Sequence, residues 1–199
     1  MKPEEWGAFY DFVLIDAISS VGAGSALLSL HSGVAYGVGP LLHFGSRQLQ
    51  ERLPPPLLNG METICLVITE PQAGSDVSNV GGTTAIKTPD GKFYIVNGLK
   101  KWITNGIYAS YFITLVRTSG KPGNLKGLSF LVIPRIECIT TKQMGMIGAH
   151  ASGTTLVEFD NVKVPVDNLI SNEGEALKYT FHNFNHELMS ACSTGPRLK

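Results

Sequence analysis

The sequence predicts an α+β fold with helical segments at both ends and a β-rich middle. Three observations lead to this prediction. Apolar residues recur at helical spacing over residues 4–20 and again over residues 173–192. Between these segments, turn residues separate short apolar runs, as expected for an antiparallel β-sandwich or barrel. The 22 glycines and 11 prolines also favour a turn-rich middle over an all-helical chain.

The N-terminal part contains two further signals. Residues 46–53 fit a short helix with Ser46 as its N-cap, and prolines 54–56 are expected to end it and to mark a domain boundary. Residues 21–39 carry five glycines, which invites comparison with a dinucleotide-binding fingerprint. No strand is expected before them, however, and Leu27 stands where the third glycine should be. Close packing of helices through small residues is therefore the favoured interpretation.

The middle of the chain is expected to hold a series of short strands. The first, residues 64–68, is an apolar run that ends in a polar loop containing Pro71 and Gly74. Pro89, Asp90 and Gly91 form a good hairpin turn between the next two strands. The other expected strands are residues 83–88, 92–97, 110–118, 127–133 and 154–159.

Composition excludes several classes of function. The 43% hydrophobic content is that of a globular chain, and 16 acidic residues balance 16 basic ones. This balance leaves no electrostatic footprint for nucleic acid or an anionic membrane. No membrane span or signal peptide is expected. The three cysteines lie far apart, which favours a reducing compartment over a disulfide framework or a cysteine metal site.

Residues 66–106 hold the candidate ligand site. The loop after the first strand offers the hydroxyls of Thr69 and Ser75, together with Gly74, whose missing side chain allows a ligand to approach the backbone. Further on, Trp102 and Thr104 set a flat aromatic group beside a hydroxyl. This pairing suits a planar ring system that needs both a stacking face and a hydrogen bond.

Residues 69–76 (TEPQAGSD) and 97–106 (NGLKKWITNG) resemble the two signature segments of the acyl-CoA dehydrogenases. Arg117-Thr118 and residues 127–131, 152–155 and 159–165 match further family motifs in the same order. The resemblance covers about residues 20 to 192. It implies the end of an N-terminal helical domain (1–60), a β-rich middle domain (61–166) and the start of a C-terminal helical domain (167–199) that is truncated here.

The resemblance implies FAD as the cofactor. In such an enzyme, the flavin supplies the redox chemistry and the protein orients it. Trp102 would pack on the flavin ring, Thr104 would place its hydroxyl near the hydride-accepting nitrogen, and Ser75 would contact both the cofactor phosphates and the acyl-CoA. Taken singly, each residue reads more simply as a strand-end hydroxyl or a core aromatic; taken together, they favour a site. The expected cofactor-binding residues are Leu66, Val67, Ile68, Thr69, Gly74, Ser75, Trp102, Ile103 and Thr104.

The implied reaction also needs a base for the proton alpha to the thioester carbonyl. In most of the family, this glutamate lies beyond the last residue of the present chain. A subset uses a glutamate on the first helix after the β-domain, and Glu187 falls at that position. The usual pattern there is glutamate followed by arginine, whereas Leu188 follows here. A solvated helix glutamate is the alternative reading of Glu187.

Other residues suggest three further chemistries, each with a simpler explanation. Glu70 and Asp76 could form a hydrolase pair, but Asp76 is better explained as a residue that fixes its own loop. His182 and His186, with His150 as a distant third, could hold a metal, yet a solvated or core pair is favoured and no metal is expected. Ser75 lacks the flanking glycines of a nucleophile elbow.

The resemblance therefore implies an enzyme of fatty acid β-oxidation that converts an acyl-CoA to the trans-2-enoyl-CoA and reduces FAD. Electrons would pass to an electron-transfer flavoprotein, and the full-length protein would be a homodimer or homotetramer in mitochondria or peroxisomes. Two alternatives stay open. One is an oxidase of the same fold that uses oxygen, and the other is an inactive remnant that serves at most as a binding domain.

Overall fold

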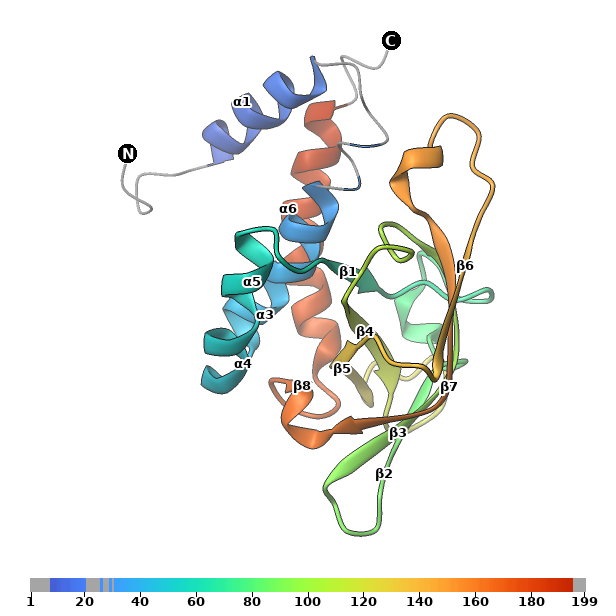
Figure 1. Ribbon diagram of the computed structural model, residues 1–199. Coiled ribbons are helices and arrows are strands. Elements are labelled where there is room, and N and C mark those ends of the chain that lie inside the picture. The colour runs from blue at the N-terminus through green and yellow to red at the C-terminus, as the bar shows by residue number, and fades with distance from the viewer. Residues whose placement is uncertain (1–7, 21–25, 27–28, 30, 195–199) are drawn as a thin grey trace.

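The computed structural model describes residues 8–20, 26, 29 and 31–194, which form a helical layer packed against a curved β-sheet (Figure 1). The helical layer lies on one side of the sheet, and the long helix α6 runs alongside the short helix α3. The α-helices are α1 (Ala8–Ser19), α3 (Gly39–Phe44), α4 (Arg47–Arg52), α5 (Pro54–Leu58) and α6 (Ala176–Thr194). The short helices η2 (Gly33–Val38), η3 (Val77–Asn79), η4 (His150–Ser152) and η5 (Val166–Asn168) join these elements.

The described residues form one eight-stranded sheet in the order β6-β7-β3-β2-β4-β5-β8, with β1 paired to β4. Most neighbouring strands are antiparallel, but β1 and β2 each run parallel to β4. The terminal strands β6 and β8 do not pair with each other, so the sheet is not a closed barrel. The strands are β1 (Ile64–Val67), β2 (Thr84–Lys87), β3 (Phe93–Ile103), β4 (Tyr111–Arg117), β5 (Leu128–Pro134), β6 (Ile139–Gln143), β7 (Thr155–Pro165) and β8 (Leu169–Ile170).

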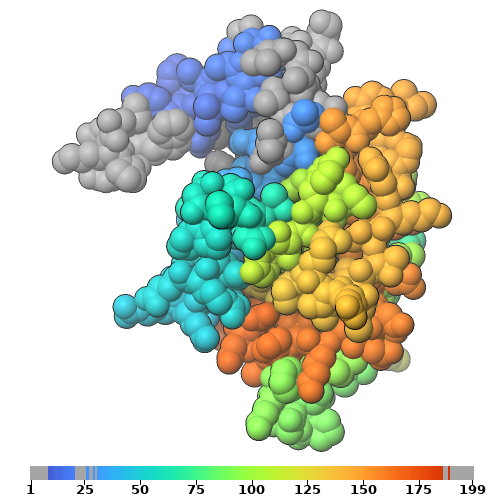
Figure 2. Space-filling model, in the orientation of Figure 1, coloured from blue at the N-terminus to red at the C-terminus, as the bar shows by residue number. Residues whose placement is uncertain are grey.

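These elements confirm the predicted α+β class and each of the expected strands, with shifted ends. The 89–91 turn joins β2 to β3, and Gly91 has the positive φ of 70° that such a turn favours. The resulting hairpin protrudes from one end of the molecule (Figures 1 and 2). β3 and β7 are longer than predicted, and the mostly polar β6 and the two-residue β8 were not predicted.

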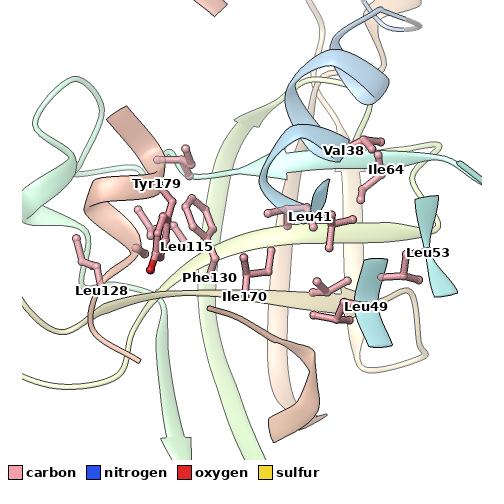
Figure 3. Close-up of a cluster of buried hydrophobic side chains, with 14 of the residues drawn as sticks. Val38, Leu41, Leu49, Leu53, Ile64, Leu115, Leu128, Phe130, Ile170 and Tyr179 are labelled. Carbon is pink, nitrogen blue, oxygen red and sulfur yellow. The ribbon is translucent and has the colours of Figure 1, made fainter. Parts of the chain in front are cut away.

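The sheet has a core on each face because β1, β4 and β5 are buried on both sides. Ile113 and Leu115 of β4 face the helices, where they join Leu41 and Tyr179 in the cluster shown in Figure 3. Phe112 and Val116 of β4 face the opposite way and pack against residues of β3 and β7. This double burial explains why β4 and β5 are continuous apolar runs rather than alternating ones.

The helical layer differs from the prediction at the prolines. Ser46 caps α4 as expected, and its hydroxyl accepts a hydrogen bond from the N–H of Leu49 at 3.3 Å. α4 ends at Arg52, just before prolines 54–56, as expected, but the same prolines also begin a further helix, α5, that was not predicted. Proline is tolerated in a first helical turn, where its missing N–H would have no intrahelical partner. No helix in the described part of the chain combines the length and apolar character of a membrane span.

Glycines bring the helical layer close to the sheet. Gly33 and Gly37 are buried in η2, and an added Cβ at Gly37 would lie 2.9 Å from the Ile64 side chain of β1. The predicted role of these glycines in close packing is therefore confirmed, although η2 packs on a strand rather than on a helix. Gly22 and Gly24 lie outside the described residues.

Gly98 holds β3 against the loop that precedes β2. Its φ is 146°, and a Cβ there would lie 2.5 Å from the carbonyl oxygen of Gly82 and 2.4 Å from the Cα of Thr83. The register of β3 against β7 shifts between Val96 and Gly98, so the strand bends at this point. Only glycine accommodates both the backbone angle and this close approach.

We expect Gly98→Ala to lower the free energy of unfolding by about 2 kcal/mol or more, because the methyl group meets backbone atoms that cannot rotate away. Urea unfolding followed by circular dichroism measures this change. Gly145→Ala is the matched control, because a Cβ at Gly145 would meet no atom within 4 Å. Equal stability of the two variants would contradict the role assigned to Gly98.

Candidate functional site

A groove of about 450 Å³ lies between the sheet and the helical layer. It is lined from the sheet side by the end of β1, the loop that follows it and the end of β3, and from the helical side by η2 and α6. Two segments that are distant in the sequence therefore meet in one place. The expected ligand-binding residues that line the groove are Leu66, Ile68, Thr69, Gly74, Ser75, Trp102, Ile103 and Thr104.

Val67 is the one expected ligand-binding residue whose side chain does not line the groove. Successive side chains of a strand point to opposite faces, so Val67 points away from the face of Leu66. Its side chain is fully buried in the core between β1 and the β3–β7 pair. A contact between Val67 and a ligand in the groove would therefore have to come from its backbone, and its place among the cofactor-binding residues stays a prediction.

The loop after β1 is a tight turn fixed by its own polar groups. The N–H of Glu70 donates to the carbonyl of Ala73 at 2.9 Å, and the N–H of Ala73 donates back to Glu70 at 3.2 Å. Asp76 caps η3 by accepting from the N–H of Ser78 at 3.2 Å. Asp76 thus fixes its own loop, as expected. The carboxylate of Glu70 is buried and does not line the groove, so the two acids do not form a hydrolase pair.

A buried ion pair joins this loop to β3. Lys100 is 0% exposed and Glu70 is 2% exposed. The Lys100 ammonium donates to Glu70 Oε1 at 3.0 Å and to the carbonyl of Ile68 at 2.8 Å. The backbone N–H of Lys101 donates to the carbonyl of Thr69 at 2.9 Å. The loop after β1 and strand β3, which both line the groove, are therefore joined directly at Thr69 and its two neighbours.

Backbone donors complete the environment of Glu70. Its Oε2 accepts from the N–H groups of Gly81 at 3.0 Å and Gly82 at 2.8 Å, and its Oε1 accepts from the N–H of Thr83 at 2.8 Å. Burial by itself would raise the pKa of the Glu70 carboxyl, but the charge of Lys100 and the backbone donors outweigh it, and the pKa is lowered. Burial also lowers the pKa of Lys100 to about 8, against the opposing charge of Glu70.

Trp102 presents its indole to the groove from an unusual backbone conformation. Its φ is 64°, and the register of β3 against β7 is irregular between Lys100 and Ile103. The side chain is 50% exposed, and the ammonium of Lys101 lies 4.7 Å from the centre of its ring. A positive φ is costly for a bulky residue, which marks a position held in place by its surroundings.

Polar groups in the groove are available to a ligand. Within the described part of the chain, the hydroxyls of Thr69, Ser75 and Thr104 form no hydrogen bond. A Cβ added at Gly74 would meet no atom within 4 Å, so the backbone there is open to approach. Together with the half-exposed indole, these groups offer a planar heteroaromatic ring both a stacking face and hydrogen-bond partners.

Sequence reasoning missed the wall that the helices and the neighbouring core contribute. Its side chains are Ser32, Tyr36, Cys65, Val77 and Phe184. Phe184 fitted the helical pattern of the last helix, but no local signal placed it opposite Trp102. Tyr36 belongs to η2, a π-helix, which is a rare element that occurs frequently at functional sites.

The remaining candidate residues lie in α6 or η4. Glu187 and His186 are in α6, but their side chains lie outside the described residues. The ring of His182 packs 5.3 Å from that of His43, while His150 is in η4. Among the described residues, no three histidine, cysteine or acidic side chains are placed to hold a metal ion.

The sequence and the fold both resemble those of known dehydrogenases. The family model for the middle domain of acyl-CoA dehydrogenases matches residues 65–162, inside the predicted middle domain, whose boundaries stay a prediction. The acyl-CoA dehydrogenase apdG of Emericella nidulans is 45% identical over 192 residues, which cover 96% of this chain and 43% of that protein. The present chain thus spans less than half the length of this relative.

Solved structures agree. A probable acyl-CoA dehydrogenase from Mycobacterium abscessus superposes with a TM-score of 0.88 at 30% identity, over 98% of this chain and 54% of that one. The complex of glutaryl-coenzyme A dehydrogenase with glutaryl-CoA gives a TM-score of 0.85 at 32% identity, over 94% and 47% of the two chains. The chain therefore belongs to the acyl-CoA dehydrogenase family, whose enzymes are FAD-dependent oxidoreductases.

Proposed function

We propose that the groove binds the flavin ring of FAD and that the protein oxidises an acyl-CoA thioester to its trans-2-enoyl product. One observation carries this proposal. Residues of two separate signature segments, including Thr69, Trp102 and Thr104, line the same groove. If these side chains faced different sides of the molecule, they could not bind one ligand together.

The described residues fit a flavin. The exposed face of the Trp102 indole would pack on the isoalloxazine ring, and the free hydroxyls of Thr69 and Thr104 would bond to its heteroatoms. Ser75 and the bare backbone at Gly74 would face the phosphates and the thioester. When bound, FAD supplies the redox chemistry of the reaction, which is to accept a hydride.

The protein's own part is to orient the substrate and to move one proton. The groove needs a carboxylate within hydrogen-bond reach of the proton alpha to the thioester carbonyl. α6 carries Phe184 into the groove wall, and Glu187 lies on the same helix, three residues further along. This position on the first helix after the β-domain, where a subset of the family carries its base, supports Glu187 as the base.

The wider assignments follow the family resemblance. They are an acyl-CoA of fatty acid β-oxidation as substrate, an electron-transfer flavoprotein as electron acceptor, a homodimer or homotetramer, and a mitochondrial or peroxisomal location. An oxidase would differ from a dehydrogenase in one measurable respect, because dissolved oxygen would rapidly reoxidise its flavin. An inactive remnant would take up no FAD.

We expect the purified chain to bind FAD, and Trp102→Ala to weaken the binding at least tenfold, about 1.4 kcal/mol, because the stacking face is lost. Titration of FAD with quenching of flavin fluorescence measures the dissociation constant. Tyr108→Ala is the matched control, since Tyr108 is an exposed aromatic residue that does not line the groove. A native chain that takes up no FAD would refute the proposal.

We expect Glu187→Gln to slow the bleaching of bound flavin by acyl-CoA thioesters at least a hundredfold, because general-base catalysis contributes about 10²–10⁴ in rate. Anaerobic absorbance measurements with a panel of acyl-CoA chain lengths give this rate, at equal flavin content. Glu137→Gln serves as the control, because Glu137 is an exposed acid outside the groove. Undiminished bleaching in Glu187→Gln would remove this residue from the mechanism.

A further inference from the structure

We propose that the buried Glu70–Lys100 pair is the positioning device of the groove, which fixes the Thr69 side of the flavin site relative to the Trp102 side. The inference rests on the proposed flavin site for its functional meaning. Neither residue lines the groove, so both would act through their neighbours. They are positioning residues rather than catalytic ones.

The ammonium of Lys100 holds the chain on both sides of Thr69. It donates to the carbonyl of Ile68 and to the carboxylate of Glu70, the residues immediately before and after Thr69. The backbone of Thr69 itself accepts from the N–H of Lys101. The position of Thr69 is thus tied at three consecutive residues to the segment that carries Trp102.

Glu70 is anchored independently of Lys100. Three backbone N–H groups, those of Gly81, Gly82 and Thr83, fix its carboxylate. The guanidinium of Arg117 secures the preceding residue by donating to the carbonyl of Val80 at 2.7 Å. The backbone of residues 81–83 therefore holds the Glu70 carboxylate in place, and the ion pair with Lys100 ties β3 to it.

Trp102 needs such an attachment because its backbone is strained. A φ of 64° would relax unless the residues on either side were held. On one side, Lys100 is buried and bonded. On the other, Asn105 is buried, its N–H donates to the carbonyl of Ser152 at 2.8 Å, and its side-chain amide donates to the carbonyl of Ile64 at 3.3 Å. Between these anchors the chain bulges and turns the indole into the groove.

The location of the pair argues against a role in general stability alone. Taking two charges out of water is expensive, and an apolar pair of similar size would often be as stable. The pair nevertheless lies where the two groove segments meet: Glu70 is next to Thr69, and a single residue separates Lys100 from Trp102. A pair at this place can fix the position of Thr69 relative to Trp102.

The test uses the whole chain carrying Trp6→Phe, which leaves Trp102 as the one tryptophan of the two in the sequence. Lys100→Met removes the ammonium but keeps an unbranched side chain only one atom shorter, and it leaves the backbone donors of Glu70 in place. Glu70→Asp keeps the charge but is one methylene too short to reach both Lys100 and the 81–83 backbone. Lys87→Met is the matched control, because it breaks the exposed Lys87–Glu173 ion pair instead.

Far-UV circular dichroism first shows which variants are folded. In folded Lys100→Met or Glu70→Asp without ligand, we expect the acrylamide quenching constant of Trp102 to change at least twofold and FAD affinity to fall at least tenfold. The Lys87→Met control should match the parent in both readouts. A role in stability alone would lower the melting temperature without moving the quenching of Trp102 in the folded state.

Three results would overturn the inference: unchanged quenching in the folded variants, an equal change in Lys87→Met, or loss of fold in both Lys100→Met and Glu70→Asp. In the last case, the pair would serve the whole sheet rather than the groove. If the parent chain binds no FAD, the proposed function fails, while the quenching of Trp102 still decides whether the pair positions the indole.

Discussion

The ion pair between Lys100 and Glu70 is the interaction on which the arrangement of the groove depends. It also carries a cost. Because the pKa of Lys100 falls from 10.5 to about 8 on burial, the folded chain binds fewer protons there than the unfolded chain between these pH values. The contribution of Lys100 to stability therefore rises with pH across that window and is lowest at neutral pH. The contribution of Glu70 to stability also rises with pH, but in the acid range: its lowered pKa favours the folded state at neutral pH, and this stabilisation is lost as the pH drops far enough to protonate the carboxylate. A pair with such a balance is better explained by the geometry that it imposes than by the stability that it adds.

Burial determined how much of the fold could be predicted from the sequence. β4 and β5 are buried on both faces, so their residues form nearly continuous apolar runs that are easily recognised. β6 was missed because it is an edge strand in which Ile139 is the one buried residue, and a polar run of this kind resembles a loop. The start of α5 was missed because three prolines in succession usually end a helix, yet the first turn of a helix requires no N–H donors.

The candidate site was predictable on one side. Thr69, Gly74, Ser75, Trp102 and Thr104 lie in two local motifs, each of which carries its own signal. The opposite wall has no such signal, because Tyr36 and Phe184 meet the groove only after η2 and α6 have packed onto the sheet. The burial and pairing of Lys100 and Glu70 were equally impossible to predict from the sequence. In a sequence, charged residues normally indicate a solvated surface, and only the three-dimensional structure reveals that these two are enclosed.

The pairing of β3 with β7 affects when the groove can form. β3 supplies Trp102, but its long partner strand comes much later in the chain: Phe93 pairs with Pro165, and Ile103 pairs with Thr155. Contacts between such distant segments form slowly, because the loop between them must close first. During synthesis, the indole-bearing strand therefore emerges from the ribosome with one edge unprotected until β7 follows. Until β7 pairs with it, this edge can pair with another chain, which is a route to aggregation.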